Sequence, residues 1–234
     1  MTNTTSNDWS RLPLKWSGRI SSLTDLEYCT DRLIAIEQRF RPVLVAHGLP
    51  SLRSSERSLE TLLQIVTDQF LSLKAAASIW AKISVRLTSF DPASVLALDE
   101  ITLMSLGLSR AKARSFHGLS RALASGDLDF SSLARQSSEE AHKRLCRLPG
   151  IGPWSAAIFQ LGALGDGDAW PAGDLALQIA AQDLFGLESR PNQKQMNTLA
   201  EGWRPYRAAA ARLLWSHYRG LKGLGQAADS PSQN

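Results

Sequence analysis

The most specific residue pattern in the sequence is a short run, LPGIGP, that separates two predicted helices. Pro149 ends the first helix because proline has no amide hydrogen to donate. Gly150 and Gly152 lack a Cβ and can adopt positive φ, so their amides can approach a phosphate closely. Pro153 begins the second helix, whose N-terminus also favours an anion. Ile151 is expected to anchor the turn in the core. The pattern therefore predicts a turn that binds the phosphates of a DNA backbone independently of base sequence. An ordinary glycine-rich turn is the alternative, and this pattern alone leaves both open.

Asp174 is the second candidate, at the predicted start of the helix LALQIAAQDLF. Aspartate at this place ordinarily caps a helix, because its carboxylate accepts hydrogen bonds from amides of the first turn. Taken by themselves, the residues favour that structural role.

The elements that position these residues are predicted to be helices throughout. Apolar residues repeat at intervals of three and four over residues 28–47 and, as one long helix, over residues 58–87. Capping residues and prolines mark further helix starts at Asp91, Asp99, Ser109, Ser137, Pro153, Asp174, Asn192 and Pro205. Connections are short and strand signals are almost absent, so the predicted fold class is all-α with about ten helices.

Composition excludes several classes of protein. The chain has 234 residues, 44% of them hydrophobic and 21% charged, which is ordinary for a globular protein. A net charge of +4 permits a nucleic-acid partner without requiring one. Two cysteines are too few for a four-cysteine zinc site or an iron–sulfur cluster, and the four histidines show no metal-binding spacing. We find no signal peptide and no apolar run of about 20 residues, so a cytoplasmic protein is expected.

Several segments resemble one known family. Residues 139–164, EEAHKRLCRLPGIGPWSAAIFQLGAL, resemble the hairpin of the helix-hairpin-helix DNA glycosylase superfamily. The downstream PAGDLALQIA resembles the segment that carries the catalytic aspartate of that superfamily. DQFLSLKAAASIW, GLSRAKARSFHGLSRALASGDLDF and WRPYRAAAARLLW are similar to the 3-methyladenine DNA glycosylase II branch. These segments follow in the family's order over residues 57–218, so together they are far more specific than the hairpin alone.

The resemblance implies that Asp174 is catalytic, beside the sugar, where it stabilises an oxocarbenium-like transition state or positions water. Trp154 stands where strand-cutting relatives have a lysine. A monofunctional enzyme that removes alkylated purines by hydrolysis, without lyase activity, is therefore expected. Trp154, Trp215 and Ile158 are expected to line the base pocket, since a tryptophan face attracts a positively charged base. Ile158 replaces a tyrosine of some alkyl-base enzymes, so the pocket wall differs there.

Gln69 and Phe70 are expected to probe the duplex, with Phe70 as an apolar wedge that fills the gap left by the extruded base. Phe70 also fits the apolar stripe of its predicted helix, so core packing is the alternative. Asp68 departs from the family's glycine, and a carboxylate at the DNA surface would repel phosphate. Six basic residues flank the hairpin helices, and the sequence does not say which of them meet phosphate: Arg110, Lys112, Arg114, Lys143, Arg144 and Arg147.

The resemblance implies two helical subdomains with a DNA-binding cleft between them. One is discontinuous and comprises residues 9–56 and 169–221; the other, residues 57–168, holds the helix-hairpin-helix. Residues 1–8 and 222–234 are expected to be disordered tails. No cofactor and no side-chain metal ligand are expected, although the family hairpin can hold a structural monovalent cation through backbone carbonyls. The expected partner is duplex DNA with damaged bases, bound by a monomer.

Two other functions stay open. A glycosylase for hypoxanthine or uracil is one of them, because Asp68, Phe70 and Ile158 depart from the family pattern. A DNA-binding protein that keeps the hairpin without catalysis is the other. The presence of Asp174 argues against it, since a protein without catalysis does not need that carboxylate.

Overall fold

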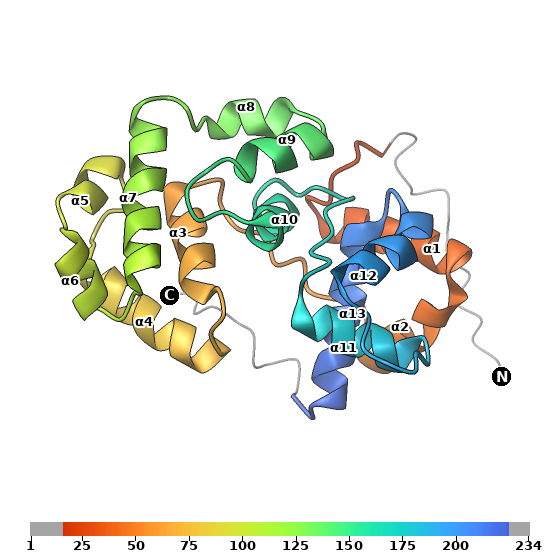
Figure 1. The fold of residues 1–234 in the computed structure, drawn as a ribbon. Coiled ribbons are helices and arrows are strands. Elements are labelled where there is room, and N and C mark those ends of the chain that lie inside the picture. Colours follow the sequence, from red (N-terminus) through yellow and green to blue (C-terminus); the bar gives the residue numbers. More distant parts are fainter. Residues whose placement is uncertain (1–15, 225–234) are drawn as a thin grey trace.

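The computed structural model describes residues 16–224. Within this part the chain forms thirteen α-helices, two short 3-10 helices and no strand, apart from a single bridge between Arg19 and Asp166. The all-α prediction is therefore confirmed (Figure 1). The tail predicted at residues 1–8, and the part of the C-terminal tail from residue 225 onwards, lie outside the described residues.

The α-helices follow one another as α1 (Leu23–Ile36), α2 (Arg41–His47), α3 (Leu59–Asp68), α4 (Leu73–Arg86), α5 (Pro92–Leu96), α6 (Glu100–Ser105), α7 (Arg110–Ala124), α8 (Phe130–Arg135), α9 (Ser138–Leu145), α10 (Pro153–Gly162), α11 (Leu175–Leu184), α12 (Gln193–Ala200) and α13 (Arg207–Leu221). The 3-10 helices are η2 (Gln38–Phe40) and η3 (Glu201–Trp203). None of the helices between residues 16 and 224 is long and apolar enough to cross a membrane.

Two hydrophobic cores hold these helices together. The first core is built from α1, α2 and α11 to α13, and the second from α3 to α9. Helix α10 contributes to both, with Leu161 in the first core and Phe159 in the second. Figure 1 shows the two groups of helices side by side with α10 between them. The division into two subdomains itself stays a prediction.

Most predicted helix starts have the physical cause that the sequence suggested. A side-chain oxygen accepts a hydrogen bond from a first-turn amide at each of the predicted caps Asp91, Asp99, Ser109, Ser137, Asp174 and Asn192. The caps of α9 and α12 are reciprocal capping boxes. Local side-chain chemistry therefore sets where these helices start.

The single helix predicted over residues 58–87 is wrong, because the chain leaves the helix after Asp68 and resumes it at Leu73. Ser72 caps the new helix α4 by accepting from the amide of Ala75. The apolar 3-4 pattern continues across this break, so periodicity alone cannot reveal it. The result is a short connecting loop, residues 69–72, near the start of the family-like DQFLSLKAAASIW segment.

The helix predicted over residues 28–47 is also divided, into α1, η2 and α2. Pro42 lies in the first turn of α2, where a missing amide hydrogen costs nothing. Helix α8, capped by Asp129, was not among the predicted helices. Thirteen α-helices therefore replace the smaller number expected from the sequence.

Candidate active site

The predicted hairpin lies between α9 and α10 and is held in shape by glycine. Gly150 has φ +78°, and a Cβ built there would lie 2.1 Å from Ser115 Oγ, so only glycine fits. Ile151 is buried, as expected for the anchor of the turn. Gly152 differs from the prediction, because its φ of −88° is open to any residue and no heavy atom would lie within 4 Å of its Cβ. The described residues therefore place no requirement for glycine at this position.

The hairpin presents backbone amides that the described part of the chain does not use. The amides of Gly150 and Gly152 donate to no acceptor within residues 16–224. Helix α10 begins with Gly152 as N-cap and Pro153 in its first turn, and no side chain caps it. Its first amides are therefore open, unlike those of the ten helices that have a capping side chain. Unpaired amides at a positive helix end suit an anion such as phosphate.

Helix α7 supports this hairpin from behind, a role that the sequence did not reveal. Ser115 faces Gly150, and a Cβ on Gly118 would lie 2.7 Å from the ring of Pro149. Small residues three apart on one helix face are the signal that could have predicted this contact.

Asp174 accepts three hydrogen bonds. Its carboxylate caps α11 through the amide of Leu177, at 3.0 Å to Oδ1. Trp154 donates its indole Nε1–H to Oδ2 at 2.9 Å, and Trp215 donates its own to Oδ1 at 3.2 Å. Asp174 thus caps a helix and is also the residue that the family resemblance predicts to be catalytic. The three hydrogen bonds fix the orientation of both carboxylate oxygens.

The two tryptophans come from different cores. Trp154, on α10, packs against the second core, and Trp215, on α13, packs against the first. All three side chains are half-buried, so the carboxylate lies where the two groups of helices meet. Each indole N–H is already used by Asp174, which leaves the ring faces for any ligand. Ile158, one turn after Trp154, is half-buried against the second core, and its pocket role stays a prediction.

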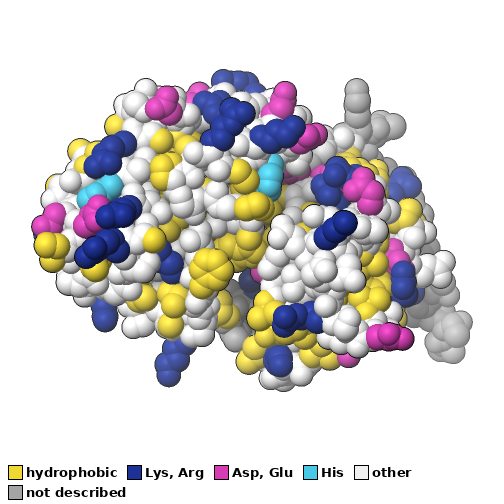
Figure 2. Space-filling view, viewed as in Figure 1, with side chains coloured by type: hydrophobic (Ala, Val, Ile, Leu, Met, Phe, Trp, Pro, Cys, Tyr) yellow, Lys and Arg dark blue, Asp and Glu magenta, His cyan; other side chains and the backbone are white. Residues whose placement is uncertain are grey.

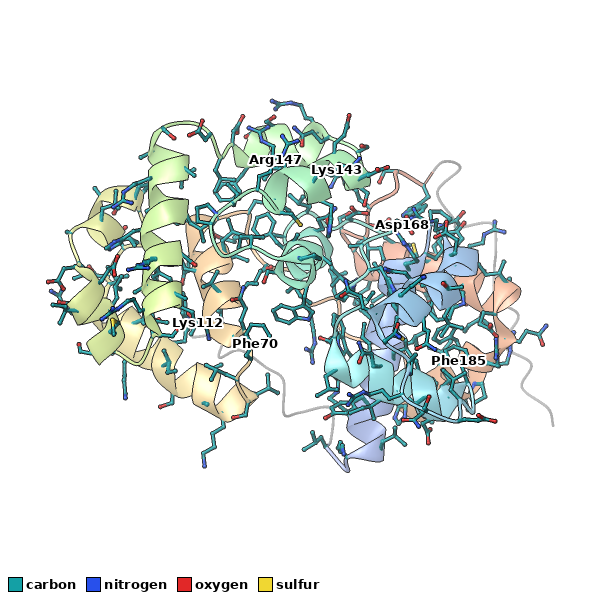
Figure 3. The ribbon with its side chains drawn as sticks, in the orientation of Figure 1. Phe70, Lys112, Lys143, Arg147, Asp168 and Phe185 are labelled. Carbon is teal, nitrogen blue, oxygen red and sulfur yellow. The ribbon has the colours of Figure 1, made fainter. Side chains whose placement is uncertain are left out.

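Phe70 projects into solvent from the loop at residues 69–72 (Figure 3). Its relative exposure is 102%, so the alternative of core packing is wrong. Its φ of +57° lies in the left-handed region, which costs an L-residue about 1–2 kcal/mol. A bulky apolar side chain held out of the core in a strained conformation matches the predicted wedge, whose contact with DNA stays a prediction.

Gln69 does not point outward with Phe70. Its Nε2 donates to the carbonyl of Gly150 at 2.9 Å and to Ser155 Oγ at 2.7 Å. Its side chain thus binds the hairpin, and the proposed probing of DNA by Gln69 stays a prediction. The predicted backbone cation at the hairpin also stays a prediction.

Asp68 is turned inward beside Lys112. Burial raises the pKa of its carboxyl to about 6, and the nearby Lys112 ammonium opposes that rise. Lys112 Nζ donates to the carbonyls of Thr67 and Gln69, both at 2.8 Å. The residue that looked repulsive to phosphate is therefore half-buried next to a cation rather than exposed on the surface.

The basic residues around the hairpin have unequal roles. Arg114 pairs with Glu100, Lys143 pairs with Glu139, and Arg144 donates to Ser132 and to the carbonyl of Asp127. Figure 2 shows Lys and Arg side chains gathered over α8 and α9 with acidic ones among them. Within the described residues the side chains of Arg110 and Arg147 have no hydrogen-bond or ion-pair partner.

Comparison with known proteins identifies the family to which the chain belongs. The model of the family described as "HhH-GPD superfamily base excision DNA repair protein" matches residues 63–205. The alkylbase DNA glycosidase-like protein mag2 of Schizosaccharomyces pombe is 29% identical over 161 residues, which cover 67% of this chain and 76% of that protein. DNA-3-methyladenine glycosylase 1 of the same yeast is 29% identical over 204 residues, covering 84% and 88%. A putative DNA-3-methyladenine glycosylase of Bacillus subtilis is 32% identical, but the match spans only 43% of its length.

Solved structures share the fold. A DNA-3-methyladenine glycosidase from Bacillus halodurans superposes with a TM-score of 0.72 at 23% identity, over 85% of this chain and 92% of that one. The S. pombe 3-methyladenine DNA glycosylase, solved in complex with abasic DNA, gives 0.74 at 24% identity, over 83% and 97%. At these identities the likeness establishes the architecture alone. Because the family model covers more than half of its length, the chain belongs to the HhH-GPD superfamily of base excision DNA repair proteins.

Proposed function

We propose that this protein is a monofunctional DNA glycosylase that removes alkylated purines, of the 3-methyladenine and 7-methylguanine type, from duplex DNA. The observation that carries the proposal is the carboxylate of Asp174, held by two indoles from different cores. Relatives named alkylbase and 3-methyladenine DNA glycosylases support the same substrate class.

In the proposed reaction the bond between sugar C1′ and the purine nitrogen breaks, and its electron pair leaves with the base. Positive charge develops on the sugar, and the Asp174 carboxylate lies beside it as the stabilising group. Water then adds to C1′ and releases its proton, which leaves an abasic site. The base of an alkylated purine is itself cationic, so it leaves without strong acid catalysis.

The pocket proposed for the extruded base is formed by the ring faces of Trp154 and Trp215, with Ile158 behind them. A tryptophan face attracts a cation by about 0.5–2 kcal/mol, which favours a charged alkylpurine over a neutral base. Because Asp174 already accepts both indole N–H groups, selection rests on charge and shape rather than on hydrogen bonds from these rings.

The absence of lyase activity is proposed from Trp154. A lyase needs an amine that attacks C1′, and tryptophan at this position of the hairpin offers none. Lys112, which binds the loop at residues 69–72, already donates to two carbonyls. The product is therefore an intact strand with an abasic site.

Duplex DNA is the proposed partner of a monomeric protein. The open amides of Gly150, Gly152 and the start of α10 bind a phosphate, and Phe70 enters the stack where the damaged base has left it. One chain supplies the hairpin, the wedge and Asp174, so no second copy is needed for the reaction.

The decisive experiment incubates the protein with duplexes that each carry a single lesion and then cleaves abasic sites with alkali. Asp174→Asn should lower base release from methylated purines at least about 100-fold, because asparagine still caps a helix but has no charge to stabilise the transition state. Asp99→Asn is the matched control, since Asp99 caps α6 outside the site.

The same assay separates the remaining candidates. Release of only hypoxanthine or uracil would show that the enzyme has that specificity instead of one for alkylpurines. Tight binding with no base release from any lesion would show that the protein binds DNA without catalysis. Strand cleavage without alkali would overturn the monofunctional assignment.

A further inference from the structure

One face of helix α7 contacts both of the elements proposed to meet DNA. Lys112, Ser115 and Gly118 are three residues apart, so they lie along one side of the helix. Ser115 is in contact distance of Gly150, and Gly118 is covered by the ring of Pro149. Lys112, at the start of this row, reaches the loop at residues 69–72. Helix α7 therefore lies beneath the hairpin and the Phe70 loop alike.

Gln69, the residue before Phe70, is held both at its backbone carbonyl and at its side-chain amide. Lys112 Nζ binds the Gln69 carbonyl at 2.8 Å, while Gln69 Nε2 binds the Gly150 carbonyl at 2.9 Å. Lys112 binds the Thr67 carbonyl as well, at the last turn of α3. The chain is thus tied to α7 and to the hairpin immediately before Phe70 turns outward (Figure 3).

These contacts account for the conformation of Phe70. Its φ of +57° is unfavourable for an L-residue, and its fully exposed ring has no packing partner to hold it there. Helix α3 ends at Asp68, so the carbonyls of Thr67 and Gln69 have no partner from a continuing helix. The Lys112 ammonium supplies that partner with three donors and no acceptor of its own.

We propose that Lys112 is a positioning residue that fixes the Phe70 wedge at a set distance from the phosphate-binding hairpin. This inference rests on the proposed function, because it assigns Lys112 a part in base extrusion. In this role the Lys112 ammonium binds the carbonyls of Thr67 and Gln69 rather than the substrate. Lys112 acts through the loop at residues 69–72. When the hairpin binds a phosphate, the fixed loop places Phe70 in the base stack at the lesion.

Lys112→Met tests the proposal, since methionine keeps the length of the side chain and removes the ammonium. Single-turnover base release should fall about tenfold or more for 7-methylguanine paired with cytosine. For the same lesion opposite an abasic analogue, where extrusion costs little, the rate should stay within about threefold of the unaltered protein. Arg121→Met is the matched control, because it removes one exposed charge from the far end of the same helix.

A double variant shows whether Lys112 acts through Phe70. Phe70→Ala alone should slow release from the paired lesion, and adding Lys112→Met should cost less than about threefold more. An equal loss on paired and unpaired lesions would overturn the proposal, as would a full additional loss in the Phe70→Ala background. Thermal unfolding monitors the fold. If Lys112→Met does not fold, Gln69→Ala tests the same link from the hairpin end, with the same two substrates and the same expected pattern.

A binding measurement separates failure of this inference from failure of the proposed function. A duplex with a tetrahydrofuran abasic analogue and 2-aminopurine opposite it reports wedge insertion without any chemistry. The unaltered protein should change the 2-aminopurine fluorescence, and Lys112→Met and Phe70→Ala should both lose that change while still binding. Retention of the signal in Lys112→Met would overturn the positioning role. Absence of base release with the signal retained by the unaltered protein would overturn only the proposed chemistry.

Discussion

Each oxygen of the Asp174 carboxylate accepts a hydrogen bond from an indole, and one of them also caps a helix. A side chain with three donors has little freedom to rotate, so the direction of its negative charge is set before a substrate arrives. The two tryptophans therefore have two proposed parts. Their faces receive the base, and their N–H groups orient the carboxylate.

Replacement of either indole by phenylalanine should separate these two parts. Trp154→Phe and Trp215→Phe each keep a ring face and lose one hydrogen bond to a charged group, so kcat should fall about tenfold or more while KM changes little. Trp80→Phe is the control, because Trp80 stacks on Phe90 instead. Steady-state kinetics with a methylated duplex measure both constants. A rise in KM at constant kcat would show that the ring face alone matters.

Asp68 shows how a residue that departs from a family pattern can be accommodated. Its carboxyl is half-buried, its pKa is raised to about 6 by that burial, and Lys112 lies beside it. The carboxyl that would repel phosphate at the surface is thus half-buried beside the Lys112 ammonium. A carboxylate in place of the family's glycine therefore changes the surroundings of Lys112 next to the loop at residues 69–72.

At the level of elements, the fold of the hairpin requires glycine at one of its two glycine positions and not at the other. Gly150 is required from inside, because its positive φ and its contact with Ser115 exclude a side chain. Gly152 faces open space and has an ordinary φ, so the fold places no demand on it. In the proposed complex with DNA, a phosphate that approaches the hairpin amides excludes a side chain at Gly152.

The two glycines should therefore respond differently to alanine. Gly150→Ala should lower the free energy of unfolding by about 1–3 kcal/mol, because it forces a strained backbone and a clash with Ser115. Gly152→Ala should leave unfolding unchanged and weaken binding to undamaged duplex DNA, because its methyl group occupies the approach of the phosphate. Urea unfolding and fluorescence anisotropy measure the pair. Loss of stability in Gly152→Ala with normal DNA binding would contradict this assignment.

The elements also show what the sequence can predict. Helix starts at Asp99, Ser109 and Ser137 were predicted because their caps act on residues three positions away. The hairpin followed from its own glycines and prolines. The break at residues 69–72 could not be predicted, because its partners Gly150 and Lys112 lie 81 and 43 positions from Gln69. The Asp174 site required the family resemblance, since Trp215 lies 41 positions from the aspartate.

At the scale of the whole molecule, a buried arginine lies between the two cores. Arg212, on α13, is 3% exposed, and burial lowers the pKa of its guanidinium to about 10. It donates to the carbonyls of Leu52, Leu161 and Ala208. Leu52 precedes α3, where the chain enters the second core, and Leu161 lies on α10, which contributes to both cores. A single buried cation therefore links the first core to both segments that lead into the second.

Without the hydrogen bonds of Arg212, the two cores should unfold at different temperatures on heating. Arg212→Met removes four charge-assisted hydrogen bonds and leaves buried carbonyls unpaired, so the melting temperature of the first core should fall by about 5 °C or more. Calorimetry should show one transition for the unaltered protein and two for the variant, with α3 to α9 unfolding at the higher temperature. Arg204→Met is the control, because that arginine is half-exposed and its ion pairs with Asp168 and Glu201 contribute little. A variant that still unfolds in one transition at the original temperature would show that the two cores are joined by α10 and its apolar contacts rather than by Arg212.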